Sequence, residues 1–287
     1  MRIVDSHHHL WDLGKNYYPW LSDQVRTVSY GDYSAIRKNY LLQDFRRDIG
    51  TVNIVKSVHM QAESQDPVAE TQWLQNIAND PGSGGFPHAI VCYVDLSDSR
   101  AEETLARHCT FANVRGVRQM LHFGPAATHL RNETWRRNLA ALSQFDLSFD
   151  TQILPSQAAE AAGIIANNPD IEFVLDHAGC PTQASLLDKS WQAAISLLAR
   201  FPNLSVKLSG FGMFDRSWTA ATIEPIVQHV LQSFGSRRCM FGSNFPVDSL
   251  MKDYNSVWDA FSASVSTLSP SEQELIFAGN AERFYRI

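Results

Sequence analysis

Short apolar runs alternate along this chain with longer segments in which apolar residues recur at helical spacing. Eight runs rich in β-branched residues predict strands, at residues 2–5, 52–61, 89–94, 114–120, 147–153, 172–176, 204–208 and 239–243. The segments between them predict helices, at residues 67–79, 100–108, 133–145, 155–167, 183–200 and 220–234. Most of the runs are apolar on both faces, which is typical of parallel strands that helices cover on one side. The pattern therefore predicts parallel strands joined by crossover helices.

Eight such units in one chain favour a closed barrel over an open sheet. An open doubly wound sheet normally has a glycine-rich phosphate loop after its first strand, whereas this chain has Asp-Ser-His-His-His-Leu-Trp there. Although 287 residues could also form two domains of about 150 residues, an α/β barrel of this size folds as one. We therefore expect an α/β fold, a (β/α)8 TIM barrel, formed by residues 1–287 as a single domain. The long connection at residues 17–49 is expected to contain short helices of its own.

The composition narrows the functional class. With 44% hydrophobic and 19% charged residues the chain is typical of a globular protein, and no apolar run approaches the roughly 18 residues that cross a bilayer. Thirty acidic against 24 basic residues, without a basic cluster, argue against a nucleic-acid partner. The four cysteines form no C-x-x-C pair and the first residues form no apolar leader, which favours a reducing compartment. We therefore expect a cytoplasmic monomer or homodimer that binds a small-molecule substrate and neither nucleic acid nor a membrane.

Three consecutive histidines follow the first predicted strand. Because side chains alternate along a strand, His7 and His9 point the same way and His8 the opposite way. The end of a barrel strand lies at the carboxyl-terminal mouth, where enzymes of this architecture have their active sites. His7 and His9 could therefore bind one metal ion together. The alternative is a surface cluster or the remnant of a tag, against which the native-looking flanking strand argues.

Two further polar residues end predicted strands. His177 closes the sixth run, in Val-Leu-Asp-His-Ala-Gly-Cys-Pro, and Asn244 follows the eighth, in Gly-Ser-Asn-Phe-Pro. A lone histidine is more often structural, but at the same rim as His7 and His9 it could supply a third ligand. Three imidazoles and a water would complete a tetrahedral catalytic zinc site.

Three motifs, in this order along the chain, resemble those of a known family. They are Asp5-Ser-His-His-His-Leu-Trp11, Asp176-His-Ala-Gly-Cys-Pro181 and Gly242-Ser-Asn-Phe-Pro246. Together they resemble the amidohydrolase superfamily, in its amidohydrolase-2 branch of sugar-acid lactonases and pyrone-dicarboxylate and sulfomuconolactone hydrolases. The resemblance runs nearly end to end. It implies a TIM-barrel hydrolase in which a histidine cluster polarises a carbonyl while a carboxylate after strand eight takes a proton from water.

The resemblance also implies how a metal would be bound. It assigns His7, His9 and His177 as the cluster, acting directly or through a divalent metal, expected to be zinc. Binuclear members of the superfamily add a lysine or glutamate at the end of strand four and a histidine after strand five. This chain instead has Arg-Gln-Met at residues 118–120 and Asp-Thr-Gln at residues 150–152. We therefore expect one metal at most, and the histidines alone are the alternative.

The strand-eight position departs from the family pattern. The usual aspartate is Asn244, whose amide can orient water but cannot act as a base near neutral pH. Three explanations remain open: another carboxylate, with Asp248 nearest, is the base; the residue was substituted to trap a ligand; or the chemistry has changed or been lost. Asn244, Asp248 and His177 are the expected catalytic residues. The missing carboxylate also predicts weaker metal binding than in relatives that have it.

Other polar residues at the predicted strand ends are candidates for substrate binding. Arg118 would project into the mouth as a fork for a substrate carboxylate, unless it forms a structural ion pair or Arg115, in the same run, takes the role. Further candidate ligand contacts, which could instead satisfy one another or pack in the core, are Gln61, His122, Lys207 and Trp11.

The preferred hypothesis is a hydrolase that opens the ester of a small sugar-acid or carboxylated lactone. Two alternatives remain. The wider amidohydrolase-2 group includes zinc decarboxylases and hydratases with similar strand-one histidines. Because Asn244 replaces the usual aspartate, a barrel that binds a sugar acid without turnover is also consistent with the sequence.

Overall fold

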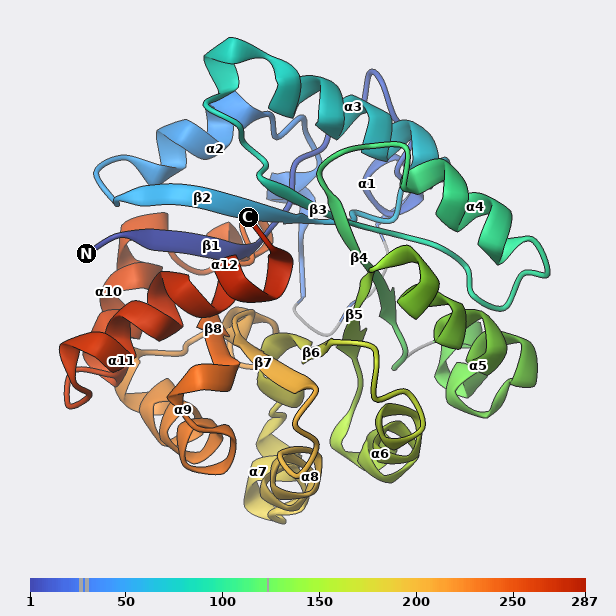
Figure 1. The fold of residues 1–287 in the computed structure, drawn as a ribbon. Helices are drawn as coiled ribbons and strands as arrows, with labels where there is room; N and C mark the ends of the chain where they lie inside the picture. Colours follow the sequence, from blue (N-terminus) through green and yellow to red (C-terminus); the bar gives the residue numbers. More distant parts are fainter. Residues whose placement is uncertain (26–27, 29–30, 123) are drawn as a thin grey trace.

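Eight parallel strands form a single sheet in sequence order (Figure 1). The structure, a computed structural model, describes residues 1–25, 28, 31–122 and 124–287. The strands are β1 (Ile3–His8), β2 (Ile54–Met60), β3 (Ala89–Cys92), β4 (Val114–Met120), β5 (Ser148–Gln152), β6 (Phe173–Leu175), β7 (Leu204–Leu208) and β8 (Cys239–Phe241). Seven of the predicted runs each contain a strand, and the first, at residues 2–5, overlaps β1, which continues beyond it to His8.

The sheet closes between the ends of β8 and β1. His8 and Phe245 form a parallel bridge, the His9 N–H donates to the Phe245 carbonyl at 2.7 Å, and the Asn244 N–H donates to the His7 carbonyl at 2.7 Å. The predicted (β/α)8 barrel is confirmed. Closure also brings the two sequence motifs at its seam into direct backbone contact.

Helices surround the barrel. The longest α-helix after each of the strands β2 to β8 is, in order, α3 (Pro67–Asn79), α4 (Ala101–His108), α5 (Glu133–Ala140), α6 (Ala158–Ala166), α8 (Ser190–Leu198), α9 (Ala220–Phe234) and α10 (Tyr254–Ser264). The bounds of α3 agree with prediction, and its first turn carries clear signals. Asp66 caps its first turn by accepting from the Ala69 N–H, and Pro67 opens it.

The remaining α-helices lie in the connections between strands or follow α10. They are α1 (Pro19–Ser22), α2 (Leu42–Ile49), α7 (Gln183–Leu187), α11 (Pro270–Glu274) and α12 (Asn280–Tyr285). The connection at 17–49 contains short helices as predicted, although residues 26–27 and 29–30 lie outside the described residues. The helix predicted at 183–200 is wrong as a single element, because Lys189 adopts a left-handed conformation (φ 61°) that separates α7 from α8. The apolar spacing concealed this break because Leu187 continues it while lying exposed.

The last turns of the chain fill the amino-terminal end of the barrel, which no predicted element covered. α12 lies beside β1 in Figure 1. Its residues Ala281, Phe284 and Tyr285 pack with inward-facing strand residues such as Val58 and Val174. Ion pairs of Glu282 with Lys56 and Arg2 fix the helix to the starts of β2 and β1.

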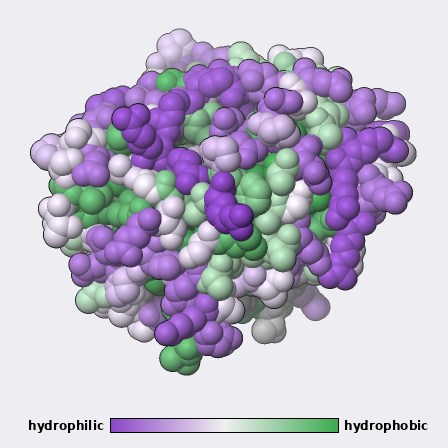
Figure 2. Space-filling model, turned by 60° about the horizontal axis from the view of Figure 1, so that its bottom comes forward, coloured by the Kyte–Doolittle hydropathy of each residue, from purple (hydrophilic) through white to green (hydrophobic). Residues whose placement is uncertain are grey.

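One face of the molecule is drawn in Figure 2. The face drawn in Figure 2 has hydrophilic residues over most of its area, with apolar groups between them. Among the described residues, no helix combines the length and apolar character needed to cross a membrane.

Candidate active site

The end of β1 turns two histidines into the barrel and one out of it. The ring centroids of His7 and His9 lie 5.2 Å apart, and that of His177 lies 4.6 Å from His7. His8 points the other way, where it stacks on Phe45 at 4.2 Å. Strand alternation therefore places His7 and His9 on the same side, and closure of the barrel brings them to His177.

His177 sits in an unusual turn at the end of β6. Its φ is 52°, and Ala178 follows at 51°, a left-handed conformation that is rare outside glycine. The His177 Nδ1 lies 2.9 Å from the Ser209 hydroxyl, at the end of β7. A Cβ at Gly210 would lie 2.4 Å from the same nitrogen, so only glycine leaves room for this ring. The neighbouring strand thus both orients His177 and accommodates it.

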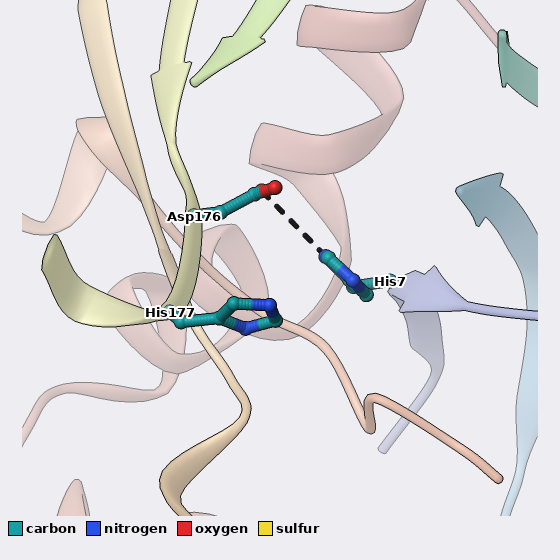
Figure 3. A group of neighbouring side chains, drawn as sticks. All are labelled: His7, Asp176 and His177. Atoms are coloured by element: carbon teal, nitrogen blue, oxygen red, sulfur yellow. Dashed lines mark ion pairs between the residues drawn. The ribbon is translucent and has the colours of Figure 1, made fainter. Parts of the chain in front are cut away.

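Two imidazoles and one carboxylate converge at the centre of the site. Asp176 Oδ1 lies 3.6 Å from His7 Nδ1, and Figure 3 shows the carboxylate of Asp176 directed at His7, with the ring of His177 beside them. One ligand atom from each of these three residues lies within 4.8 Å of the others. Within the described part of the chain, neither ring nitrogen of His7 has a hydrogen-bond partner although both are buried. An arrangement of this kind fits a ligand or an ion that would satisfy His7.

The donor set fits one divalent metal ion. His7, His177 and Asp176 offer two imidazole nitrogens and a carboxylate oxygen, a common set for a catalytic zinc. His9 lies outside this group of ligand atoms, and its Nδ1 lies 2.9 Å from the Met60 carbonyl. Compared with the predicted His7, His9 and His177, the structure adds Asp176 and moves His9 to the side. Arg118 contacts the same carboxylate, so its positive charge competes with a metal.

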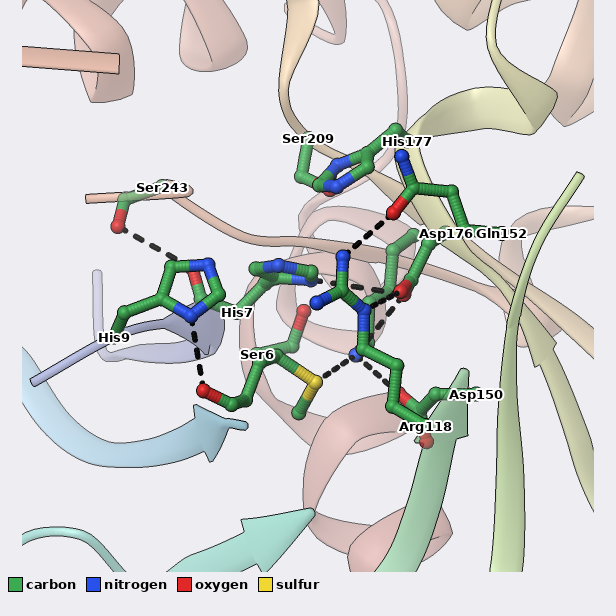
Figure 4. Close-up of polar contacts among 12 residues, drawn as sticks. Ser6, His7, His9, Arg118, Asp150, Gln152, Asp176, His177, Ser209 and Ser243 are labelled. Atoms are coloured by element: carbon green, nitrogen blue, oxygen red, sulfur yellow. Dashed lines mark hydrogen bonds and ion pairs between the residues drawn. The ribbon is translucent and has the colours of Figure 1, made fainter. Parts of the chain in front are cut away.

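Arg118 is held rigidly at the wall of the site (Figure 4). Its Nε donates to Asp176 Oδ2 at 2.8 Å, and its Nη2 donates to the Gln152 Oε1 at 2.6 Å. Its remaining nitrogen lies toward His7 in Figure 4. Arg118 therefore combines the two sequence hypotheses, since it forms a structural ion pair and still directs one N–H group toward the histidines. Its rival Arg115 instead donates to the carbonyls of residues 112 and 114, at the start of β4.

Lys207 lies beneath the histidines. Its Nζ is 2.5 Å from Asp150 Oδ2, 3.3 Å from Asp176 Oδ1 and 3.1 Å from the Met60 sulfur. These three contacts account for its three protons. Lys207 therefore has no donor left for a substrate, in contrast to the sequence expectation, and acts on the site through Asp176.

The charges of these groups follow from burial and pairing. Burial alone would raise the pKa of Asp176, but the positive charges of Lys207 and Arg118 bring it well below its ordinary value. Burial lowers the pKa of His177 to about 3 and that of His7 well below its usual range. At neutral pH the site therefore contains an ionised carboxylate and neutral imidazoles.

Asn244 and Asp248 lie together after β8. The Asn244 Nδ2 donates to Asp248 Oδ1 at 3.3 Å, and both side chains are buried. Burial raises the pKa of Asp248 to about 7, an effect that the Asn244 contact partly offsets. Position 244 lacks the aspartate usual in the family, but a carboxylate is present four residues later, at Asp248, and it contacts Asn244.

The other predicted contacts surround this centre. The Gln61 Oε1 accepts from the Glu63 N–H at 2.6 Å, which fixes its amide at the end of β2. Burial, and to a lesser extent Arg118, lower the pKa of His122 to about 4. The Trp11 indole N–H donates to the residue 38 carbonyl at 2.7 Å, so Trp11 can offer a substrate only its ring.

Asp5 holds the seam at which the barrel closes. Its carboxylate accepts from the Ser243 N–H at 2.8 Å, the Ser243 hydroxyl at 2.6 Å, the Tyr254 hydroxyl at 2.8 Å and the His7 N–H at 3.2 Å. Burial raises the pKa of Asp5 to about 6, so the group is still ionised at neutral pH. Asp5 thus joins the two strand ends that carry His7 and Asn244.

Replacing Asp5 by asparagine is expected to lower the free energy of unfolding by about 1–3 kcal/mol, because an amide nitrogen would face buried donors. Urea unfolding at neutral pH measures this loss. Asp253→Asn is the matched control: Asp253 is exposed and caps α10 through the Ser256 N–H at 2.9 Å, a role that asparagine fills equally well. Equal stability of Asp5→Asn and the wild type would contradict the role of Asp5 at the seam.

The chain matches a known protein family over nearly its whole length. The family model described as "Amidohydrolase" matches residues 4–287. The chain belongs to this amidohydrolase family. The resemblance seen in the three motifs is thereby confirmed, and the protein is a hydrolase by family.

This amidohydrolase is similar over nearly its whole length to several known proteins. An uncharacterized protein of Sinorhizobium fredii, y4mH, is 39% identical over 295 residues, which cover 99% of this chain and 98% of that protein. An L-fucono-1,5-lactonase of Burkholderia ambifaria is 28% identical over 298 residues, covering 99% of this chain and 95% of that protein. A crystal structure of a Burkholderia multivorans amidohydrolase with bound zinc superposes with a TM-score of 0.84 at 25% identity, and each chain is covered completely.

Two residues of the amidohydrolase site were missed as site residues by sequence reasoning. Strand alternation predicts opposite directions for Asp176 and His177, but the left-handed turn at His177 brings both side chains to the same centre. Ser209 directly follows β7 and orients His177. Their positions at the ends of predicted strands were the available signal, since that is where a barrel collects its site residues.

Proposed function

We propose that this amidohydrolase opens the ester of a small sugar-acid or carboxylated lactone by attack of water on the carbonyl. The main support for this proposal is the convergence of His7, His177 and Asp176 beside Arg118, which is hydrogen-bonded to Asp176. The similarity to an L-fucono-1,5-lactonase supports a lactone as the substrate.

The carbonyl oxygen becomes negative during the attack, so donors placed around it lower the barrier. When the Ser209 hydroxyl donates to His177 Nδ1, the proton of this neutral ring is on Nε2, which can donate to the carbonyl oxygen. The Arg118 N–H group on the side of His7 can donate to the same oxygen or to a substrate carboxylate. In the alternative tautomer, with the proton on Nδ1 and directed to the Ser209 hydroxyl, His177 would instead hold a zinc ion through Nε2 together with His7 and Asp176, and the zinc would supply Lewis-acid polarisation of this carbonyl.

The attacking water needs a base, and Asp248 is the best candidate. Asn244 has no charge, whereas Asp248, with a pKa raised by burial to about 7, is poised to accept a proton near neutral pH. The Asn244 amide, hydrogen-bonded to Asp248, would orient the carboxylate and the water. His9 supports this side of the site. Because its Nδ1 donates to the Met60 carbonyl, the Nε2 of this neutral ring is left as an acceptor.

Proton release from matched lactone pairs tests the proposal. D-glucono-1,4-lactone and D-glucaro-1,4-lactone differ only in the oxidation of C6 from an alcohol to a carboxylate. We expect hydrolysis above the spontaneous rate, and a kcat/KM at least about tenfold higher for the glucarolactone if Arg118 binds the carboxylate. His177→Ala should abolish the excess rate, and equal rates for the variant and the wild type would refute the assignment.

Parallel incubations with acids in place of lactones separate the two alternatives. Release of carbon dioxide from an unsaturated or aromatic acid, without lactone hydrolysis, would identify a decarboxylase. Saturable binding of a sugar acid without turnover would identify a binding protein, the outcome that the uncharged Asn244 favours. Activity gained by Asn244→Asp would instead identify an impaired hydrolase.

A further inference from the structure

The third residue from the carboxyl terminus reaches the charged groups inside the barrel. Tyr285, at the end of α12, is fully buried, and its hydroxyl donates to Asp150 Oδ2 at 2.7 Å. Its ring centroid lies 5.3 Å from Lys207 Nζ. Tyr285 therefore contacts both partners of the innermost ion pair of the barrel.

A continuous chain of contacts leads from this ion pair to the site. Lys207 Nζ lies between Asp150 Oδ2, at 2.5 Å, and Asp176 Oδ1, at 3.3 Å. Asp176 in turn contacts His7 Nδ1 at 3.6 Å and Arg118 Nε at 2.8 Å. Tyr285 is thus separated from His7 by three side chains, all of them buried.

The position of Lys207 between two carboxylates depends on how much charge each presents. The Tyr285 hydroxyl shares the oxygen of Asp150 that Lys207 also contacts, and the other oxygen, Oδ1, has no hydrogen-bond partner within the described residues. Without the hydroxyl, Asp150 would present more uncompensated charge and draw Lys207 away from Asp176. Asp176 would then be free to turn toward Arg118.

We propose, on the basis of the lactonase function above, that Tyr285 is a positioning residue of the active site. Its hydroxyl balances Asp150, keeps Lys207 between Asp150 and Asp176, and through Asp176 sets the arrangement of His7 and Arg118. The end of the chain thus takes part in the geometry of the histidine cluster at the opposite end of the barrel.

The hydroxyl is not needed to attach α12 to the barrel. The Asn280 Nδ2 donates to the carbonyls of Ser236 at 2.7 Å and Cys239 at 2.6 Å, and Glu282 pairs with Lys56 at 2.8 Å. The ring of Tyr285 also packs in the apolar cluster inside the barrel. Removal of the hydroxyl alone should therefore leave the helix in place.

Tyr285→Phe tests the kinetic consequence, because phenylalanine retains the ring and its packing. We expect kcat for the best lactone to fall about tenfold with KM unchanged within twofold. Tyr40→Phe is the matched control, since the Tyr40 hydroxyl donates to Asp48 Oδ2 at 2.6 Å, outside this chain of contacts. An unchanged kcat in Tyr285→Phe, or an equal fall in Tyr40→Phe, would overturn the proposal.

A double-mutant cycle with Asp150→Asn distinguishes positioning from packing. If Tyr285 acts through Asp150, adding Tyr285→Phe to Asp150→Asn should change kcat by less than about twofold. Effects that multiply independently would show that Tyr285 does not act through Asp150.

A spectroscopic measurement makes the result independent of turnover. The imidazole nitrogen signals of His7, assigned in protein with labelled histidine through the loss of signal in His7→Gln, should shift in Tyr285→Phe and not in Tyr40→Phe. Unchanged His7 signals would refute the positioning role. If the wild type hydrolyses no lactone but the signals shift, the lactonase function fails and the structural connection stands.

Discussion

Replacing His7 by glutamine is expected to lower kcat/KM for lactone hydrolysis by about two to three orders of magnitude. His7 lies at the centre of the cluster, with His177 at 4.6 Å and Asp176 Oδ1 at 3.6 Å, so its loss removes the group around which the others are arranged. Glutamine keeps a polar side chain of similar reach. The loss should therefore appear in kcat/KM, measured from proton release, while the free energy of unfolding changes little.

His8 provides the matched control, one residue away on the other face of β1. Its ring stacks on Phe45, and its Nε2 lies 2.9 Å from the Ser57 hydroxyl, away from the site. We expect His8→Gln to lower the free energy of unfolding by about 1–2 kcal/mol through lost packing and hydrogen bonding, with kcat/KM retained within about threefold. Equal losses of activity at both positions would show that His7 is structural.

Replacing Asp248 by asparagine is expected to lower kcat by about two to four orders of magnitude, because water would lose its proton acceptor. The pH profile makes the test specific. A base acts only when deprotonated, so with a pKa near 7 the wild-type rate should be low in acid, rise through neutral pH and level off above it. In Asp248→Asn this acid limb should disappear, leaving a low rate at every pH.

The neighbouring amide provides the control for this assignment. Asn244 contacts Asp248, so Asn244→Asp in the Asp248→Asn background returns a carboxylate to the same part of the site. We expect this double variant to recover at least about tenfold in kcat. A fully active Asp248→Asn variant with an unchanged acid limb would exclude Asp248 as the base.

The fold was largely predictable because its signals are local. Short runs that are apolar on both faces predicted the strands, and Asp66 and Pro67 predicted the start of α3. The division of residues 183–200 into two helices could not be predicted, since it depends on the left-handed conformation of Lys189 at the surface. The filling of the barrel by α12 was not predictable either, because barrel closure decides that Tyr285 joins the apolar cluster of Val58 and Val174.

The sequence by itself determined which strand ends carry chemistry. Alternation along β1 is a short-range rule, and it sufficed to put His7 and His9 on one side, while the family motifs pointed to His177 and to the departure at Asn244. The rule of alternation needs only the covalent neighbours of each residue, and the motifs need only the order of residues along the chain.

Only the tertiary structure decided which charges these residues meet. The left-handed turn at His177 brought Asp176 into the cluster, and the register of β5 and β7 placed Lys207 between Asp150 and Asp176. Barrel closure therefore pairs Lys207 with two carboxylates at the floor of the site, so that it is not available to a substrate. Contacts between residues distant in sequence follow from how the strands pair and where the barrel closes, and burial at those contacts fixes the charge of each group.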